Sequence, residues 1–216
     1  MSQLSLPIAW SQRGEPASLL VNAANEAALA LLDDPTRWPA HCTLLVGPRH
    51  SGRSLIGRLF ASRHGADSLI DDADDADEEM LFLRWNMARD ATTPLLLVAR
   101  EAPPVWAVRL PDLRTRLATA AVARILPPDE GVAAAVIAHG LEQAGSAFAP
   151  DLPDFVARRV TRCYDALASV AACLNAESLS SGRKLTVASA RVALAANGLL
   201  AEVSGTEQGE GSGPSG

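Results

Sequence analysis

The chain has 216 residues, a formal net charge of −6 and an aromatic content of only 4%. This length allows one medium-sized domain with a small appended domain and a substantial core. The many alanines and leucines, together with so few aromatic residues, favour helices over an all-β fold. The negative charge and the lack of a dense basic run argue against unspecific binding to nucleic acid, which requires a basic face.

The first thirteen residues, 1–13, show neither a helical nor a strand period, but they contain a candidate ligand segment. A glutamine amide offers fixed hydrogen bonds, two leucines offer apolar anchors, and a proline reduces the entropy lost on docking. This combination resembles the pentapeptides that bind the bacterial sliding clamp, whereas the alternative is an ordinary disordered terminus. The predicted clamp-binding residues are Gln3, Leu4, Ser5, Leu6 and Pro7.

A helix, or a loop that enters one, is predicted over residues 18–32, because apolar residues recur there at helical spacing. Asn22 and Asn25 are interleaved with these apolar residues. They are either ordinary capping residues or, because this helix precedes the next motif, residues that lie near an adenine base. We include Asn25 among the predicted nucleotide-binding residues.

A phosphate-binding loop is predicted where the apolar strand 42–46 ends. Two glycines allow backbone N–H groups to turn toward an anion, and the following helix, about residues 54–63, adds its N-terminal dipole. Ser54 is expected to place a hydroxyl on Mg²⁺, whereas Arg53 stands where lysine is usual and presents its charge as a planar fork. A plain glycine turn is the alternative. The predicted nucleotide-binding residues here are Gly47, Pro48, Arg49, His50, Ser51, Gly52, Arg53, Ser54 and Leu55.

A pair of carboxylates follows a short apolar step at residues 69–70. A phosphate-loop ATPase needs one carboxylate to hold Mg²⁺ through water and a neighbour to orient the attacking water, and we assign these roles to Asp71 and Asp72. The alternative is an acidic, solvated loop, since acidic residues are dense throughout 67–79. The interval between the loop helix and Asp71 is too short for a further strand, so we expect a sheet with one strand fewer than usual.

An amphipathic helix is predicted over residues 79–89 and a strand over 93–99. The continuous apolar run of this strand implies burial on both faces and therefore a parallel sheet. Arg100 follows it, at a position where a polar residue usually contacts the γ-phosphate, and we interpret Arg100 as an unusual sensor of that phosphate.

The segment Leu110-Pro111-Asp112-Leu113-Arg114-Thr115-Arg116-Leu117 carries two arginines that on most proteins would be solvated surface. Together with the phosphate loop and the carboxylate pair, it resembles the AAA+ module of the DnaA family of replication initiators, and more closely the Hda-type regulators of that family. The resemblance extends over about residues 19–200. It implies that Arg116 is an arginine finger that reaches a neighbouring subunit's nucleotide, with Arg114 as a supporting charge.

The resemblance implies an α/β AAA+ P-loop NTPase module with a small all-α lid. Its domains would be a flexible clamp-binding tail (1–13), the nucleotide-binding core (14–126), the lid (127–202) and a disordered Gly/Ser/Glu tail (203–216). Lid helices are predicted over 129–144, 152–160, 163–176 and 187–199, the last one capped by Thr186. Arg162 matches a lid arginine that senses the nucleotide phosphates, or else it is a surface charge at a helix end.

The cysteines and the hydropathy pattern predict the cellular compartment of the protein. Cys42, Cys163 and Cys173 are odd in number and lack the spacing of metal ligands or of a CxxC redox pair, and we interpret Cys163 and Cys173 as small core residues. No signal-like apolar run follows a basic N-terminus, and no run of about 20 apolar residues is present to span a membrane. The sequence therefore predicts a cytoplasmic protein without membrane contact.

The resemblance implies a regulator of chromosomal replication initiation with two partners, DnaA and the DNA-loaded sliding clamp of DNA polymerase III. Arg116 would stimulate ATP hydrolysis by DnaA, while the chain's own site would bind ADP or ATP with Mg²⁺ and would have weak or no ATPase activity. We expect no sequence-specific DNA binding, because no helix-turn-helix segment follows the lid. Two alternatives are a self-contained ATPase of the clamp-loader or remodeller type and a non-hydrolysing adaptor of DnaA. The chain is also a candidate to form a homodimer.

Overall fold

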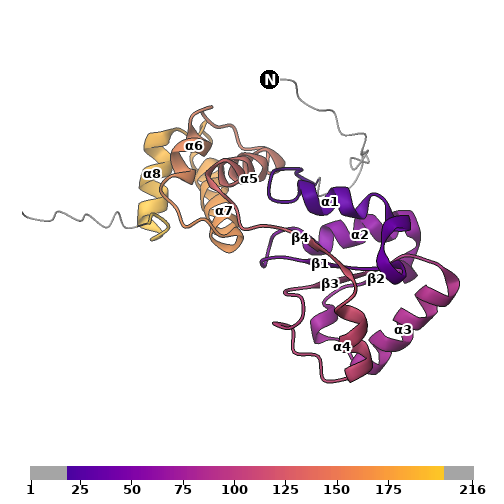
Figure 1. The fold of residues 1–216 in the computed structure, drawn as a ribbon. Helices are drawn as coiled ribbons and strands as arrows, with labels where there is room; N and C mark the ends of the chain where they lie inside the picture. The colour runs from indigo at the N-terminus through magenta and orange to yellow at the C-terminus, as the bar shows by residue number, and fades with distance from the viewer. Residues whose placement is uncertain (1–18, 202–216) are drawn as a thin grey trace, which may run out of the picture.

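The structure is a computed structural model that describes residues 19–201. The predicted clamp-binding residues 3–7 and the predicted tail 203–216 lie outside the described residues. Within that range, a parallel sheet with helices on both faces is followed by a bundle of helices (Figure 1). The chain is therefore an α/β core with an all-α appendage.

The central sheet has four strands in the order β2-β3-β1-β4, and every neighbouring pair is parallel. The strands are β1 (Cys42–Val46), β2 (Leu69–Ile70), β3 (Leu95–Ala99) and β4 (Ala121–Arg124). Every residue of β1 and β3 is buried, as their continuous apolar runs predict. The two-residue β2 is an edge strand, and four strands within residues 19–201 agree with the expected loss of one strand.

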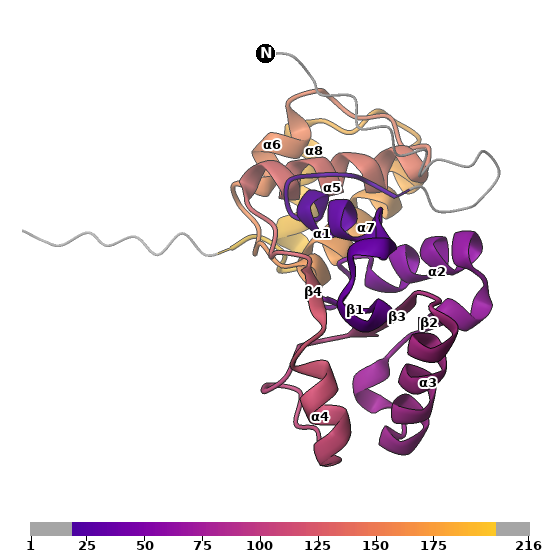
Figure 2. The same ribbon diagram turned by 45° about the vertical axis from the view of Figure 1, so that its right-hand side comes forward.

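Helices cover both faces of the sheet (Figures 1 and 2). One face carries α1 (Glu26–Leu32) and α2 (Arg53–His64), where Leu45 of β1 packs with Ile56 and Phe60. The other face carries α3 (Glu78–Ala91) and α4 (Pro111–Leu117), where Leu44 packs with Trp85 and Leu113. Successive residues of β1 therefore anchor opposite layers, which follows from the two-residue period of a strand.

Four short 3₁₀ turns lie in the connections of the core. Two of them, η1 (Pro35–Arg37) and η2 (Pro39–His41), lead from α1 into β1. The other two, η3 (Ala66–Ser68) and η4 (Ala73–Asp75), flank β2. The acidic segment after β2 is therefore a compact turn that leads directly into α3.

The appendage has a hydrophobic core of its own. It consists of α5 (Glu130–Gln143), α6 (Leu152–Ala157), α7 (Tyr164–Ser181) and α8 (Val187–Ala196), with Ile137, Leu167 and Leu194 among its fully buried residues. Tyr164 joins this bundle to the α/β core, because its ring packs in the same cluster as Leu45 and its hydroxyl donates a 3.1 Å hydrogen bond to the Leu126 carbonyl. Burial raises the pKa of the Tyr164 hydroxyl, and the nearby Asp129 adds to this effect.

Some predicted helix boundaries are wrong for identifiable reasons. The segment predicted as a helix or a loop that enters one is a turn followed by a helix that begins at Glu26, because the amide oxygens of Asn22 and Asn25 accept backbone N–H groups of that turn. The helix predicted to end at 176 continues to Ser181 and ends at Gly182, which has a φ of 62°. The helices predicted over 152–160 and 187–199 end earlier, at Ala157 and Ala196.

The cysteines differ in environment. Cys42 is buried in β1, where burial raises the pKa of its thiol, and Cys173 is half-buried against the lid core. Cys163 is exposed at the N-cap of α7, so its interpretation as a core residue is wrong. Between residues 19 and 201, no helix combines the length and the hydropathy needed to cross a bilayer.

Candidate functional site

The predicted phosphate loop connects β1 to α2, and the structure requires glycine at both Gly47 and Gly52. A Cβ on Gly47 would lie 2.9 Å from the Ile125 Cβ and 3.0 Å from the Ile125 carbonyl oxygen, which is closer than packed atoms allow. Gly52 has a φ of 89°, in the left-handed region that favours glycine, and it is the N-cap of α2. The loop therefore brings its backbone close to the sheet and then turns sharply into the helix.

One polar atom in this loop is buried without a partner. The hydroxyl oxygen of Ser51 makes no hydrogen bond within the described chain, and the residue is buried. Buried hydroxyls normally have a partner, so an unpaired one in a loop of this shape fits a bound anion or an ordered water. Ser51 is one of the predicted nucleotide-binding residues.

The structure brings the two predicted Mg²⁺ ligands together. The Ser54 hydroxyl, in the first turn of α2, lies 3.2 Å from a carboxylate oxygen of Asp71, which directly follows β2. A hydroxyl and a carboxylate are oxygen ligands of the kind that Mg²⁺ uses beside substrate phosphates. No group of three or more histidine, cysteine or carboxylate side chains within residues 19–201 is arranged to hold a metal ion. The roles of Ser54 and Asp71 toward Mg²⁺ stay predictions.

Asp72 is exposed, begins η4 with a φ of 49°, and donates its backbone N–H to Asp71 at 3.1 Å. Its predicted role in orienting a water stays a prediction.

Arg53 is tied to the sheet. Its guanidinium donates a hydrogen bond from Nη1 to the Ala99 carbonyl at the end of β3. The parallel register places Ala99 opposite Val46, the last residue before the loop. An arginine has five N–H donors, so one bond to Ala99 leaves others for an anion in the loop. The guanidinium of Arg53 can therefore bind Ala99 and an anion at the same time, which the compact ammonium of a lysine would do less readily.

The phosphate loop touches the lid through a residue that the sequence reasoning missed. Nδ1 of His50 contacts a carboxylate oxygen of Asp165 in the first turn of α7, and the two residues are 115 positions apart. Both side chains remain more than half exposed. No local pattern marks Asp165, because only the docking of the lid on the core brings it to the loop.

The predicted lid sensor, Arg162, has a different partner. Its guanidinium lies 3.7 Å from a carboxylate oxygen of Glu130 at the start of α5, and Arg158 lies 3.7 Å from the other oxygen. Arg162 directly precedes the N-terminal end of α7. Asp165, in the first turn of the same helix, contacts the phosphate loop. The role of Arg162 toward nucleotide phosphates stays a prediction.

The predicted adenine residue, Asn25, is held locally. It is only 4% exposed, its amide nitrogen donates to the Leu20 carbonyl at 2.8 Å, and its amide oxygen accepts from Asn22 N–H at 2.9 Å. The adjacent Ala24 carbonyl accepts a hydrogen bond from Leu126 N–H, at the entrance to the lid. Asn25 therefore shapes a turn beside the junction of core and lid, and contact with adenine stays a prediction.

Arg100 is fastened to the acidic turn. Its Nε lies 2.5 Å from Asp74 Oδ2 and its Nη2 lies 2.5 Å from Asp75 Oδ1. The hydrogen bond and charge of Asp74, followed by the charge of Asp75, raise the pKa of Arg100. In this arrangement the guanidinium links η4 to the residue that follows β3, and its predicted contact with a γ-phosphate stays a prediction.

The arginine segment forms α4 and packs against α3. The guanidinium carbon of Arg116 lies 4.5 Å from the centroid of the Phe82 ring, whereas Arg114 is exposed. Residues two positions apart do not share a helix face, so the two arginines have different surroundings. The predicted site residues therefore fall into two groups, one around the phosphate loop and one on α4.

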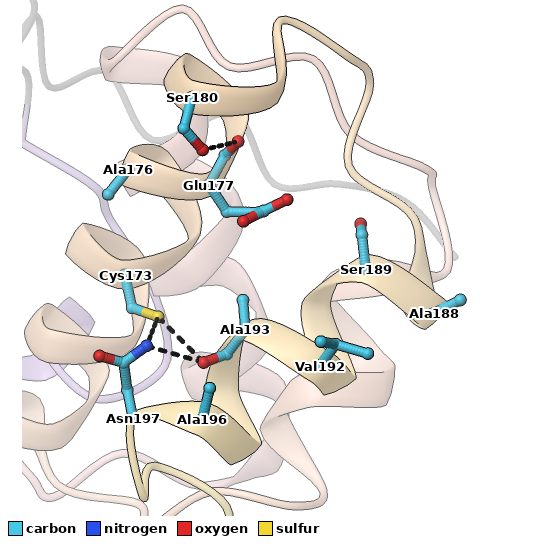
Figure 3. A pocket seen from close by; sticks show the side chains of 10 residues that line it. All are labelled: Cys173, Ala176, Glu177, Ser180, Ala188, Ser189, Val192, Ala193, Ala196 and Asn197. Carbon is cyan, nitrogen blue, oxygen red and sulfur yellow. Dashed lines mark hydrogen bonds between the residues drawn. The ribbon is translucent and has the colours of Figure 1, made fainter.

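The lid carries an open groove between α7 and α8 with a volume of about 770 Å³ (Figure 3). Cys173, Asn197 and the Ala193 carbonyl form a small hydrogen-bonded cluster at its base. Glu177 is the sole charged residue among those that line it. The groove offers no cation for phosphate and is not part of the nucleotide site.

No family model matches the sequence, and no curated protein matches it. Among solved structures, domain III of the Thermotoga maritima replication initiation protein DnaA is similar, with a TM-score of 0.67 at 17% identity, over 82% of this chain and 94% of that one. The Thermotoga maritima RuvB Holliday junction branch migration motor gives a TM-score of 0.55 at 12% identity, over 71% and 61%. The replication initiator DnaA bound to AMPPCP and single-stranded DNA gives 0.59 at 11% identity, over 76% and 65%.

The chain therefore has the AAA+ fold, and the predicted α/β class with a parallel sheet and an all-α lid is confirmed. It spans 61% of the RuvB chain and 65% of the nucleotide-bound DnaA chain. Its likeness to domain III of DnaA covers nearly all of that domain. The narrower resemblance to Hda-type regulators stays a prediction.

Proposed function

We propose that this chain regulates chromosomal replication initiation by stimulating ATP hydrolysis on DnaA through Arg116, while residues 3–7 bind the DNA-loaded sliding clamp. The position of α4 relative to the chain's own phosphate loop carries this proposal. The helix ends at Leu117, shortly before β4, and Ala121 of β4 pairs with Thr43 near the start of β1. The loop follows Val46 at the other end of β1.

Because all strands are parallel, the end of α4 lies near the N-terminal ends of the strands, whereas the phosphate loop lies at their C-terminal ends. Arg116 is therefore on the side of the sheet away from the chain's own phosphate loop, and in this proposal its target belongs to another molecule. A guanidinium that reaches the phosphoryl oxygens of a partner's ATP stabilises the charge that develops there. Such a finger supplied in trans contributes about 10³–10⁵ in rate. The exposed Arg114 would add a supporting positive charge.

The chain's own site fits a nucleotide with Mg²⁺. Ser54 and Asp71 would hold the metal, the unpaired Ser51 hydroxyl and the backbone of the loop would bind phosphate oxygens, and Arg53 would add charge from its anchor on Ala99. When bound, Mg²⁺ would neutralise phosphate charge. The contact between His50 and Asp165 links this loop to the lid, so an ADP or ATP molecule held there would fix the lid on the core.

The clamp-binding segment would act as a tether. A tether of this kind converts the second contact into an intramolecular one with an effective concentration in the range of about 1 mM. Two weak contacts, one to the clamp and one to DnaA, would then combine only where a clamp has been loaded on DNA. This would confine the activity to replicated DNA.

The proximity of Ser54 and Asp71 favours one other function, a self-contained ATPase. That function predicts steady turnover of ATP by the purified protein alone. The attachment of Arg100 to Asp74 and Asp75 does not support it, because these two carboxylates already pair with the guanidinium that would contact a γ-phosphate. A non-hydrolysing adaptor of DnaA would produce neither turnover alone nor stimulation of DnaA.

The test is hydrolysis of ATP bound to DnaA, measured with and without this protein and with and without a clamp loaded on DNA. Stimulation is expected only when protein and loaded clamp are both present. The double variant Gln3→Ala with Leu6→Ala is expected to lose clamp binding and this stimulation. Stimulation that persists fully in this variant would refute the tether, and an unchanged DnaA rate in every mixture would refute the proposed function.

A further inference from the structure

Helix α3 holds the start of α4 through a single carboxylate. The two oxygens of Glu78 accept the backbone N–H of Arg109 at 3.0 and 3.1 Å, and one of them also accepts that of Leu110 at 2.6 Å. Leu110 directly precedes the first residue of α4, and the Glu78 side chain is only 17% exposed. The contact fixes where the helix begins and in which direction it runs.

The same helix also holds the other end of α4. Phe82, one turn after Glu78, lies beneath the guanidinium of Arg116 at 4.5 Å from the ring centroid. Residues four positions apart share one face of a helix, so Glu78 and Phe82 present a carboxylate and a ring side by side to α4. Both Phe82 and Arg116 are half-buried.

The packing between these two contacts is apolar. Leu113 and Leu117 of α4 are buried in the cluster that contains Leu81 and Trp85 of α3. These contacts hold the body of α4, but they leave the direction of a long, flexible arginine side chain undetermined. Arg114 shows the difference, because it is exposed and no contact within residues 19–201 restrains its guanidinium.

We infer that Glu78 and Phe82 are positioning residues that direct Arg116, with Glu78 fixing the helix and Phe82 the guanidinium. The catalytic consequence rests on the proposed function, in which Arg116 acts on a partner's ATP. A guanidinium that is already ordered loses less conformational entropy when it binds a phosphoryl group, so pre-ordering raises the rate at saturation. Arg114, which has no such support, can contribute charge but not a fixed direction.

The first test requires no partner. In the nuclear magnetic resonance spectrum of the full chain, labelled with ¹⁵N-arginine, the Nε–H signal of Arg116 is expected to show the upfield shift of a group above an aromatic face. Arg116→Lys assigns the signal, Phe82→Leu removes the shift, and Phe82→Tyr keeps it. The Arg114 signal serves as the internal control. Absence of the shift in the wild type, or its persistence in Phe82→Leu, would overturn the inference.

The second test measures the stimulated hydrolysis of ATP on DnaA at saturating protein. Phe82→Leu is expected to lower the maximal rate by about 2- to 5-fold, as expected for a half-buried cation–π contact that solvent still reaches. Glu78→Gln is expected to lower it by about tenfold, as expected for hydrogen bonds to a charged group. The half-saturating protein concentration should not change, and Phe82→Tyr should restore the rate. Glu79→Gln, an exposed neighbour, is the matched control.

The two tests separate the inference from the proposed function. If wild-type protein does not stimulate DnaA, the proposed function fails, while the spectrum still decides whether Phe82 orders Arg116. If the spectrum shows the ordered guanidinium but Phe82→Leu and Glu78→Gln stimulate as well as the wild type, the positioning role is overturned. Equal thermal unfolding of Phe82→Leu and Phe82→Tyr shows that a difference between them does not arise from misfolding.

Discussion

The Ser54 hydroxyl and the Asp71 carboxylate lie 3.2 Å apart, although they come from the helix after one strand and the turn after another. The segments that follow β1 and β2 leave the sheet on the same side because both strands are parallel, and α2 then lies across the intervening β3 to contact β2. This arrangement places the two predicted Mg²⁺ ligands within reach of one ion.

Replacing Ser54 by alanine should reduce the contribution of Mg²⁺ to nucleotide binding. We expect the affinity for nucleotide in the presence of Mg²⁺ to fall by roughly 10- to 100-fold, as when the support of a bound metal is removed. Affinity without Mg²⁺ should change little, because the backbone of the loop remains. Isothermal titration with and without Mg²⁺ measures both values. Ser62→Ala, on the same helix, is the control, and an equal loss with and without the ion would contradict the assignment.

Gly47 should not tolerate even a methyl group. A Cβ there would lie 2.9 Å from the Ile125 Cβ and 3.0 Å from the backbone oxygen of the same residue. Gly47→Ala is therefore expected to lower the free energy of unfolding by about 1–3 kcal/mol, as overpacking does. The control is Gly131→Ala in α5, where the nearest atom is at an ordinary 3.6 Å. Urea denaturation distinguishes the two, and equal stability of both variants would show that the loop relaxes.

The His50–Asp165 contact should matter for local closure more than for global stability. Both side chains are more than half exposed, so Asp165→Asn is expected to change the free energy of unfolding by less than about 1 kcal/mol. Hydrogen exchange of the loop residues 49–52 should nevertheless become faster, because the loop loses its contact with α7. Asp154→Asn, exposed on α6, is the matched control. Unchanged exchange in the loop would show that this contact does not hold the lid.

Glu78 should make stability depend on acid pH. Hydrogen bonds from the backbone N–H of Arg109 and then of Leu110 lower the pKa of Glu78, and the exposed Arg109 guanidinium at 3.8 Å acts in the same direction. A lowered folded-state pKa means that the stabilisation is complete above the unfolded-state pKa and is lost as pH falls through the folded-state pKa.

Glu78→Gln should therefore be less stable than wild type at neutral pH, by about 1 kcal/mol. The difference should shrink as the pH falls through the acid range in which Glu78 takes up its proton. Urea denaturation at a series of pH values measures it, with Glu79→Gln as the control. A difference that is constant over this range would show that the carboxylate charge is not what holds α4.

The local pattern of the sequence accounts for the position of the candidate residues that directly follow a strand, while their binding roles stay predictions. A buried strand, a glycine loop and a helix are contiguous in the chain, and Asp71 directly follows β2, so the parallel sheet and the packing of α2 across β3 bring Ser54 and Asp71 together. Continuous apolar runs predicted β1 and β3 to within two residues for the same reason. These elements are specified by local pattern.

Other features depend on how distant segments dock, and no local pattern specifies them. The partner of His50 is 115 positions away, and that of Arg53 is a backbone carbonyl, which any residue at position 99 would provide. Glu78 belongs to an acidic run in which only the folded structure distinguishes it from Glu79. The exposure of Cys163 likewise follows from its place at the N-cap of α7, where the chain turns away from the lid core.

The most direct measurement is single-turnover hydrolysis of labelled ATP bound to DnaA, with a clamp loaded on DNA and with either wild-type protein or Arg116→Ala. Arg116→Ala is predicted to reduce the rate to that of DnaA without this protein, a loss within the range of about 10³–10⁵ that a finger in trans contributes. Binding of the variant to the clamp should be unchanged. Stimulation by Arg116→Ala equal to that of the wild type would contradict the claim that Arg116 acts on ATP held by another protein.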